Sequence, residues 1–497
     1  MSFAIIHTRA AMGLHAPEVQ VEVHLSQGLP ALTIVGLPEA AVRESKDRVR
    51  SAILNSGFQF PNRRLTINLA PADIPKDGSR LDLPIALGIL AASGQLAAES
   101  LQACECVGEL ALNGRLRPVQ GVLSVARAAK QAKRTLLLPS ANAAEAARIA
   151  GLTIYAADDL ASLCAHLQGE QLLTPVTASP RQSVAVELPD LADVRGQHRA
   201  RRALEIAAAG GHSMLLSGPP GTGKTMLASR LAGILPELSD EDSLEVANIY
   251  SIANQNYDYG ARPFRAPHHT ASPAALVGGG SNPKPGEITL AHHGVLFLDE
   301  LPEFDRKTLE VLRQPLESHE VVISRAARQV TFPARFQLIA AMNPCPCGGC
   351  GDGVNACKCT PDMISRYRAR LSGPLLDRID LHIDVPALPA SDLQQRTPVE
   401  DSATVRARVI AARQRQLQRQ GLSNHRLSPQ QLDQYAPLAA AEQQIMQMAQ
   451  QRLGLSARGY HRVLRVARTI ADLAGATAIA APHLTEALGY RGNMDSR

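Results

Sequence analysis

Tryptophan is absent from this 497-residue chain, and aromatic residues make up only 3% of it. So few rings exclude base stacking as the main way to hold a nucleic acid. Long hydrophobic runs are missing as well: the longest apolar stretch, residues 83–96, is broken by Pro84, Gly88 and Gly94 and is too short to span a bilayer. Residues 1–9 lack the basic start and long apolar run of a secretory signal. The sequence therefore predicts a cytoplasmic protein with no membrane partner.

A strong excess of one charge is also missing. The net charge of +5 does not by itself identify a nucleic-acid binder, and 45% hydrophobic with 20% charged residues is typical of a soluble globular protein. The chain is too long for one hydrophobic core, so we expect two or three domains. Of the eight cysteines, five lie between Cys345 and Cys359, which favours a metal or thiol cluster in a reducing compartment over disulfides.

One octet fits a phosphate-binding loop at every fixed position of the pattern G-x-x-x-x-G-K-[ST]. A buried strand is expected before it, at residues 213–216, and a helix after it, at residues 226–231. Such a turn presents backbone N–H groups and a helix N-terminus to a triphosphate. Lys224 would reach the β- and γ-phosphates, and Thr225 would hold Mg²⁺. The octet consists of Gly218, Pro219, Pro220, Gly221, Thr222, Gly223, Lys224 and Thr225.

The second half of the predicted site follows downstream. Residues 295–298 are an apolar run that ends in Asp299 and Glu300, as expected for a central parallel strand that delivers carboxylates to its C-terminal edge. Asp299 would position Mg²⁺, and Glu300 would polarise the attacking water. The sequence thus predicts an ATP-hydrolysing core that uses ATP and Mg²⁺.

A further apolar run, residues 336–342, ends in Asn343. This amide could orient the lytic water between Glu300 and the γ-phosphate. Alternatively, it starts an Asn-Pro turn at Pro344.

The cysteine cluster directly follows. Cys345 and Cys347 form one C-x-C pair, Cys357 and Cys359 form another, and Cys350 lies between the pairs. Four thiolates in two close pairs can complete a tetrahedral structural zinc site. A loop of free thiols is the alternative, and the fifth cysteine leaves the choice of ligands open.

The first 170 residues carry no nucleotide motif, and their mixture of strand-like and helix-like stretches predicts an α+β domain. Residues 75–82 and 108–118 resemble the two active-site segments of the Lon protease domain. In that alignment Arg80 stands where the family has its serine, and Leu123 where it has its lysine. Neither side chain can perform the chemistry, and Ser79, one residue away, lacks a lysine partner. We therefore expect a Lon-type fold, related to the second domain of ribosomal protein S5, without catalytic activity; an active protease is the alternative.

Residues 193–209 resemble the segment that covers the adenine in AAA+ ATPases, and this resemblance implies two arginines. Arg378, in the stretch 372–380, matches the arginine that reaches the neighbouring subunit's γ-phosphate in AAA+ rings, with Arg370 as a competitor. Arg458 resembles the lid arginine that contacts phosphates within its own subunit. The arginines that follow it, Arg462, Arg465 and Arg468, are explained as well by a solvated basic face.

Residues 262–270, residues 286–304 and the cysteine cluster together resemble the YifB/ComM family of bacterial magnesium-chelatase-like AAA+ ATPases. This resemblance covers nearly the whole chain. It implies a homo-hexameric ring that acts on branched or single-stranded DNA and promotes branch migration during natural transformation. A magnesium-chelatase-type motor for metal insertion is the alternative, although no D-x-S-x-S signature occurs. A scaffold without motor activity is disfavoured by the complete set of ATPase motifs.

Two segments are candidates for DNA contact because insertions at these places project into the pore of helicase-type AAA+ rings. They are the insertion 248–290 and a predicted hairpin at 320–332. Phosphate contacts there would be independent of sequence and sensitive to salt. For the histidines, packing or turn formation is equally open. The candidate side chains are Arg265, His268, His269, Arg325 and Arg328.

The predicted fold class is α/β, with an α+β Lon-type domain over residues 1–170, a linker over 171–190, an AAA+ P-loop core over 191–390 and an all-α lid over 391–497. An arginine-rich helix at 405–420 is either a solvated arm or a second DNA contact. Its arginines are Arg406, Arg408, Arg413, Arg415 and Arg419.

Overall fold

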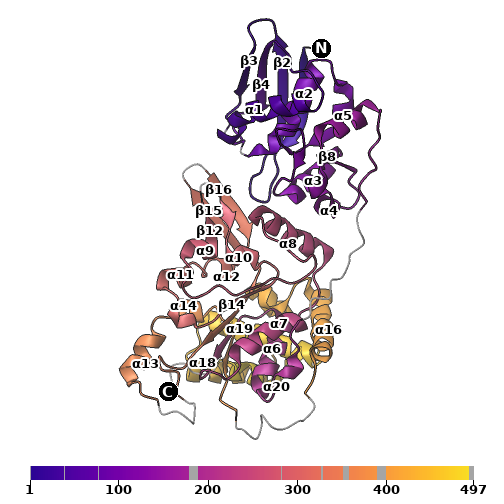
Figure 1. The fold of residues 1–497 in the computed structure, drawn as a ribbon. Coiled ribbons are helices and arrows are strands. Elements are labelled where there is room, and N and C mark those ends of the chain that lie inside the picture. Colours follow the sequence, from indigo (N-terminus) through magenta and orange to yellow (C-terminus); the bar gives the residue numbers. More distant parts are fainter. Residues whose placement is uncertain are drawn as a thin grey trace. The chain divides into compact units, whose positions relative to one another are not determined.

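The fold is that of a computed structural model (Figure 1), which describes residues 2–38, 40–76, 78–177, 188–280, 283–325, 328–350, 357–388 and 399–491. The chain separates into two compact units. Unit 1 consists of Met1–Val184 and Ser243–Tyr259, and unit 2 of Ala185–Asp242 and Gly260–Arg497. Each unit is described by itself.

Unit 1 is built on a mixed seven-stranded sheet with the order β3-β4-β2-β1-β5-β8-β9. The pairs β1·β2 and β2·β4 are antiparallel, whereas the pairs β3·β4, β1·β5, β5·β8 and β8·β9 are parallel. Alternating burial in β2 and β4 indicates that one face of these strands lies on a core. The strands are β1 Phe3–Arg9, β2 Glu18–Ser26, β3 Ala31–Val35, β4 Arg64–Ala70, β5 Cys104–Cys106, β8 Thr135–Pro139 and β9 Ile154–Ala157, with a small ribbon of β6 Glu109–Leu110 and β7 Leu116–Arg117.

The helices of unit 1 pack on its sheet and form two separate hydrophobic cores with it. Most of the apolar stretch at residues 83–96 lies in α2, and every residue of this helix is buried. It packs with α1 and α5 in one core, while α3, α4 and the residues of α8 from Ser243 onward contribute to the other. The helices are α1 Ala40–Asn55, α2 Asp82–Ala92, α3 Val122–Gln131, α4 Ser140–Ala146, α5 Leu160–Gln168 and α8 Asp240–Ala253.

The grouping of Ser243–Tyr259 with unit 1 differs from the predicted boundaries, which assigned this segment to the ATPase core. The contacts explain the difference. Ser124 Oγ donates a hydrogen bond of 2.8 Å to Asn248 Oδ1, and the amide of Gly121 donates one of 3.1 Å to Ser251 Oγ. Ala247 is buried in the core of α3 and α4. A segment of the predicted insertion is therefore structurally part of unit 1.

The two Lon-like segments lie close to each other in unit 1, but their side chains have structural partners. Arg80 is buried and donates to the carbonyl of Gln120, just before α3, and Leu123 on α3 is buried. Ser79 Oγ donates to the carboxylate of Glu109. The Lon-type assignment itself stays a prediction.

Unit 2 contains a five-stranded, all-parallel sheet with the order β11-β14-β17-β10-β18. Its strands β14 and β17 are buried along their whole length, and all their residues except Gln337 are apolar, as the sequence predicted. The strands are β10 Met214–Ser217, β11 Phe264–Arg265, β14 Val295–Leu298, β17 Gln337–Met342 and β18 Leu381–Asp384. All C-terminal strand ends share one edge of this sheet, and all N-terminal ends share the other.

Helices α6 and α7 pack on each other beside the sheet, and a C-terminal helical region follows it (Figure 1). The region after residue 399 is all-helical, as predicted. The helices around the sheet are α6 His198–Gly210, α7 Lys224–Ile234, α9 Pro273–Val277, α10 Glu287–Leu290, α11 Arg306–Glu310, α12 Pro315–Ser318, α13 Pro361–Arg368 and α14 Gly373–Leu376. The C-terminal helices are α16 Ser402–Gln420, α17 Pro429–Tyr435, α18 Ala440–Leu453, α19 Ala457–Leu473 and α20 Ala481–Gly489.

Two small ribbons extend from the core of unit 2. The predicted hairpin forms as β15 Glu320–Arg325 and β16 Arg328–Pro333, in antiparallel register with Arg325 opposite Arg328. The other ribbon pairs β12 Gly278–Gly279 with β13 Lys284–Pro285. Within the described ranges, no helix has the length and apolarity needed to cross a membrane.

Candidate active site

The predicted phosphate loop joins β10 to α7, as the sequence implies. Gly221 and Gly223 have φ values of +76° and +87°, in the left-handed region that favours glycine. At Gly218 a larger side chain does not fit, because a Cβ atom there would lie 2.1 Å from the carbonyl oxygen of Val385. Gln197, in the predicted adenine-side segment, reaches the carbonyl of Pro386 next to this loop at 2.8 Å. The loop conformation therefore depends on its glycines.

Lys224 begins α7 and turns its ammonium group back into the loop. Its Nζ donates to the carbonyls of Gly218 at 2.6 Å and Pro219 at 2.7 Å, and to Asn343 Oδ1 at 3.2 Å. Burial lowers the pKa of Lys224, while Asp299 and Glu300 oppose that shift. Lys224 begins the helix after β10, and Asn343 follows the adjacent strand β17. Their side chains therefore meet, as the functional interpretation of Asn343 requires.

The two acids after β14 lie on the same edge. Thr225 Oγ1 donates to Asp299 Oδ2 at 2.7 Å, which brings together the two predicted Mg²⁺ residues. A hydroxyl and a carboxylate at this separation are oxygen donors of the kind Mg²⁺ prefers. Glu300 adopts φ 52° and ψ 45°, a left-handed conformation that costs a non-glycine residue on the order of 1–3 kcal/mol.

His269 lies at this site. Its Nδ1 is 3.3 Å from Glu300 Oε2, and its ring is 4.1 Å from that of His268. His268 is exposed and contacts Thr270 Oγ1 at 2.9 Å. The sequence left DNA contact and packing or turn formation equally open for this pair. His269 directly precedes Thr270 in the loop after the edge strand β11, and this stretch gave no signal for a carboxylate partner more than thirty residues away.

Arg378 lies at the opposite edge of the sheet. It precedes β18 by three residues, whereas the phosphate loop follows β10. Because β10 and β18 are parallel and paired along their length, the two positions are separated by a four-residue strand, about 13 Å. Arg378 cannot join the loop of its own chain without crossing the sheet.

Arg458 lies with Arg378 and not with the phosphate loop. Both side chains line a cavity of about 420 Å³ together with Ser213, the residue that precedes β10. Arg378 Nη2 is 2.7 Å and Arg458 Nη2 is 3.1 Å from the same oxygen, Glu317 Oε1. Arg458 thus lies on the edge away from the phosphate loop, and its contact with phosphates of its own subunit stays a prediction.

Arg370, the competitor of Arg378, is on the near edge. Its Nη1 lies 2.9 Å from Glu303 and 3.2 Å from the carbonyl of Pro302, just after Glu300. Its guanidinium is thus engaged beside the acids of its own chain. Arg378, on the opposite edge, is buried and pairs with Glu317.

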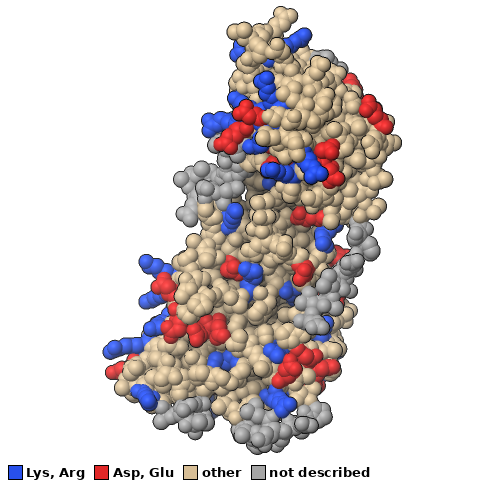
Figure 2. Space-filling model, in the orientation of Figure 1, with Lys and Arg blue, Asp and Glu red and all other residues tan. Residues whose placement is uncertain are grey.

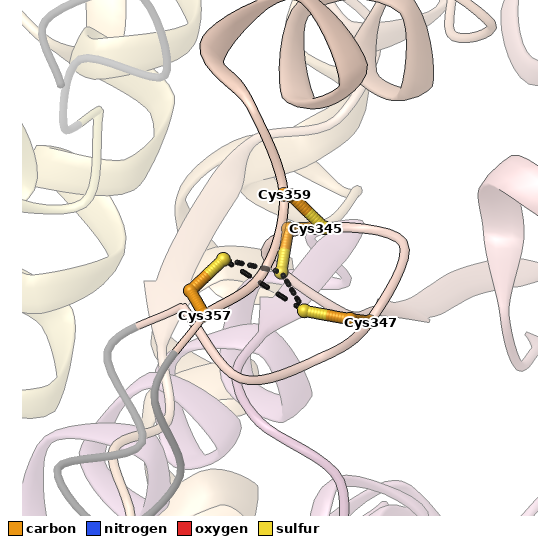
Figure 3. A group of neighbouring side chains, drawn as sticks. All are labelled: Cys345, Cys347, Cys357 and Cys359. Carbon is orange, nitrogen blue, oxygen red and sulfur yellow. Dashed lines mark hydrogen bonds between the residues drawn. The ribbon is translucent and has the colours of Figure 1, made fainter.

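Four of the five clustered cysteines converge (Figure 3). The Sγ atoms of Cys345, Cys347 and Cys357 lie 3.5–3.7 Å apart, and all four, including that of Cys359, lie within 4.8 Å of one another. Tetrahedral zinc with Zn–S bonds of about 2.3 Å requires sulfur separations of about 3.8 Å. The geometry therefore fits zinc and leaves out Cys350.

The cysteine loop also contacts the phosphate loop. At Gly348, where φ is +77°, an added Cβ atom would lie 2.6 Å from ring carbons of Pro220. The amides of Gly349 and Lys358 hydrogen-bond to the Cys347 thiol and lower its pKa to about 6, which favours the thiolate that a metal binds. A metal held here would support the wall of the nucleotide site.

The DNA candidates are dispersed. Arg265 on β11 pairs bidentately with Glu287 at 2.6 and 2.7 Å, so its guanidinium is occupied within the chain. Arg325 and Arg328 are opposite each other at the tip of the hairpin; their side chains lie outside the described residues. Figure 2 shows that basic and acidic side chains alternate on the face in view, without a broad basic field.

Comparisons with known proteins identify the family. Three family models match in succession: subunit ChlI of Mg-chelatase over residues 21–142, magnesium chelatase subunit ChlI over residues 190–393 and its C-terminal part over residues 399–491. Protein YifB of Salmonella typhimurium is 52% identical over 99% of this chain and 97% of its own. Competence protein ComM of Haemophilus influenzae is 52% identical over 99% of this chain and 98% of its own. This chain belongs to the YifB/ComM family of magnesium-chelatase-like ATPases.

The likeness to chelatase subunits is weaker. The magnesium-chelatase 38 kDa subunit of Rhodobacter capsulatus is 26% identical over 60% of this chain and 87% of its own. The YifB/ComM relatives, in contrast, cover both units of the chain. Since the family model for residues 21–142 also carries a chelatase description, the presence of unit 1 does not by itself separate a chelatase-type protein from a DNA-directed one.

Proposed function

We propose that this protein is an ATP-driven DNA motor, a homo-hexameric translocase that promotes branch migration during natural transformation or recombination. The observation that carries the proposal is the division of the candidate site between two edges of one sheet. The phosphate loop, Asp299 and Glu300 follow the C-terminal ends of strands. Arg378 instead precedes β18, and Arg458 lines the same cavity as Ser213, which precedes β10. A site divided in this way is completed when the arginine edge of one subunit meets the loop edge of the next. Such head-to-tail contact closes into a ring when its rotation allows.

Each residue at the loop edge has a role that its present contacts suggest. Lys224 would exchange its carbonyl partners for phosphate oxygens, and Thr225 with Asp299 would hold Mg²⁺. Bound Mg²⁺ neutralises charge on the phosphates. Glu300 would accept the proton of the attacking water, which Asn343 would orient. The neighbour's Arg378 and Arg458 would stabilise the negative charge that develops on transfer.

The proposal of DNA as substrate rests on the name of a relative and on the hairpin. ComM of Haemophilus influenzae is called a competence protein and matches nearly the whole chain. The β15–β16 hairpin carries two arginines at its tip, which suits contact with a phosphate backbone. We further propose that unit 1, with a Lon-type fold that lacks catalytic residues, serves assembly or substrate contact, and that the four cysteines hold a structural zinc ion.

The alternative is a chelatase-type ATPase that drives metal insertion or remodels a protein, which the family descriptions keep open. One experiment separates the two: the ATPase rate of the purified chain with no DNA, with linear duplex, with a fork and with a four-way junction. The DNA motor predicts stimulation by DNA, strongest with the branched substrates. An ATPase that hydrolyses ATP but neither binds nor responds to any of these DNAs would support the chelatase-type reading.

A further inference from the structure

The cavity that holds Arg378 and Arg458 is rich in cationic side chains, and its carboxylates are few. Arg426, Arg462 and Arg465 also line it, against Glu317 and Asp380. Asp380 is committed elsewhere, since it pairs with His212 at 3.0 Å and with Arg462. Glu317 is therefore the lining carboxylate that contacts both Arg378 and Arg458.

The cavity also contains donors that lack an acceptor. The side chain of Arg378 is only 6% exposed, and its Nε has no hydrogen-bond partner among the described residues. The Nε of Arg462 is in the same state. A buried, unpaired donor on a charged group is costly. Both arginines line the cavity, and unpaired donors on them point to a site that accepts an anion from outside the chain.

We propose that Glu317 is a positioning residue that holds Arg378 and Arg458 in place of an anion and must release them when the neighbouring subunit presents the terminal phosphate of ATP. This inference rests on the proposed function, in which those arginines act on a neighbour. One carboxylate oxygen serves both guanidinium groups, at 2.7 and 3.1 Å. A phosphate carries more charge and more acceptor oxygens than a carboxylate, so it can replace Glu317 at both arginines and also reach the unpaired Nε.

Glu317 lies close in sequence to the β15–β16 hairpin, so replacing Glu317 by phosphate at the arginines would affect the hairpin. It belongs to α12, and two residues separate it from Glu320, where the β15–β16 hairpin begins. His319, between them, has a positive φ of 59° and ends the helix. Release of Glu317 from the arginines thus acts at the base of the hairpin proposed to contact DNA.

The test compares Glu317→Gln with the parent in full-length protein, by the ATP dependence of hydrolysis. The substitution keeps the shape of the side chain but removes its charge. Because Glu317 is 43% exposed, water screens its ion pairs with both arginines, and we expect the ATP concentration at half-maximal rate to fall about two- to fivefold. The maximal rate should change by a smaller factor. Glu317→Asp, which keeps the charge, should move this concentration back toward the parent value.

Glu400→Gln is the matched control. Glu400 forms a similar exposed pair with Arg408, at 2.7 and 2.9 Å, and does not line the arginine cavity. It should leave the half-maximal ATP concentration unchanged. A second measurement uses the concentration of a non-hydrolysable ATP analogue that assembles half of the protein into rings. Glu317→Gln should lower it in the parent background but not in Arg378→Ala.

The outcomes distinguish failure of the role proposed for Glu317 from failure of the proposed shared site. An unchanged or higher half-maximal ATP concentration in folded Glu317→Gln rings overturns the role of Glu317, and so does an equal shift in Glu400→Gln. If Arg378→Ala instead hydrolyses ATP like the parent, the proposed shared site itself fails, whatever Glu317→Gln does. Thermal unfolding of each variant shows whether loss of the Glu317 charge destabilises the fold because buried Arg378 has lost its partner. If Glu317→Gln is destabilised in this way, the comparison of Glu317→Asp with the parent decides.

Discussion

Nδ1 of His269 lies 3.3 Å from Oε2 of Glu300, and this contact joins the loop after the edge strand β11 to the proposed general base. Both side chains are partly exposed, at 32% and 53%, so the contact can open without disrupting a core. A carboxylate held by an imidazole is less free to accept a proton from water. The pair therefore relates a loop that the sequence associates with DNA to the hydrolytic step.

We predict that His269→Ala raises the ATPase rate measured without DNA by up to about fivefold, the effect of losing one solvent-exposed ion pair. The added stimulation by DNA should become smaller by a similar factor. His268→Ala removes the neighbouring ring but not the contact to Glu300, so its effect should be smaller. A His269→Ala rate at or below that of the parent, in protein that still binds ATP, would contradict this role.

The opposing roles of Lys224 and Glu300 give a second prediction. Lys224→Ala should weaken ATP binding, because it removes the charge from the loop that would hold the phosphates. Glu300→Gln should bind ATP but slow hydrolysis by a factor of about a hundred or more, the usual range for loss of a general base. Binding of a fluorescent ATP analogue and phosphate release measure the two effects. Normal turnover by Glu300→Gln would show that another group accepts the proton.

The sequence predicts much of the nucleotide site because its signals are local. An octet of fixed spacing specifies the turn between β10 and α7, and an apolar run ending in two acids specifies β14 and its edge. Because β10 and β17 are parallel neighbours in the sheet, their C-terminal ends bring Asn343 close to Lys224. The four-cysteine cluster is similarly local, but only the three-dimensional loop separates Cys350 from the other four.

What the sequence could not provide depends on distant partners. The arginines of α16 looked like a solvated arm or a DNA contact, yet half-buried Arg413 donates to the carbonyl of Ala208 and Arg419 pairs with Asp472, 53 residues away. Arg468, expected on a solvated face, is 1% exposed and pairs with the same Asp472. Whether an arginine is a surface charge or a buried structural donor is decided by such partners, and periodicity alone does not contain them.

The shared edge of Arg378 and Arg458 predicts that both act on a neighbouring subunit. Each alanine variant should lose hydrolysis by about a hundredfold or more, since an arginine that stabilises transferred phosphate contributes at least that much. Mixing either variant with Lys224→Ala protein should restore activity. In an equal mixture about a quarter of the interfaces combine an intact loop with an intact arginine edge.

The mixing experiment also tests the placement of Arg458 separately. If Arg458 contacted phosphates in its own chain, Arg458→Ala protein would contribute no working loop, and the mixture with Lys224→Ala would stay inactive. Mass spectrometry of the intact rings is needed to show that mixed assemblies form. Recovery with Arg378→Ala but not with Arg458→Ala would limit the shared site to Arg378.

The geometry of the cysteine cluster predicts about one zinc ion per chain in protein purified without chelator. Cys345→Ser combined with Cys359→Ser should remove it, whereas Cys350→Ser should keep it, because Cys350 is not part of the converging group. Since Gly348 packs on Pro220, loss of the metal should also weaken ATP binding. Elemental analysis and analogue binding measure the two effects. Metal-free parent protein with normal ATP affinity would show that the thiols are free.

The last prediction concerns the DNA contact. If Arg325 and Arg328 at the hairpin tip meet phosphates, replacing both with alanine should reduce the slope of log affinity against log salt by about 1.8 for duplex or about 1.4 for single-stranded DNA. Arg265→Ala provides the contrast, because Glu287 already occupies that guanidinium, and its salt slope should stay close to that of the parent. The measurement is DNA binding across a salt series for the parent and both variants, with thermal unfolding as the check on folding. An equal loss of slope in Arg265→Ala would mean that its pair with Glu287 opens on DNA. An unchanged slope in the double variant would remove the hairpin from DNA binding and move the contact to another surface of the chain.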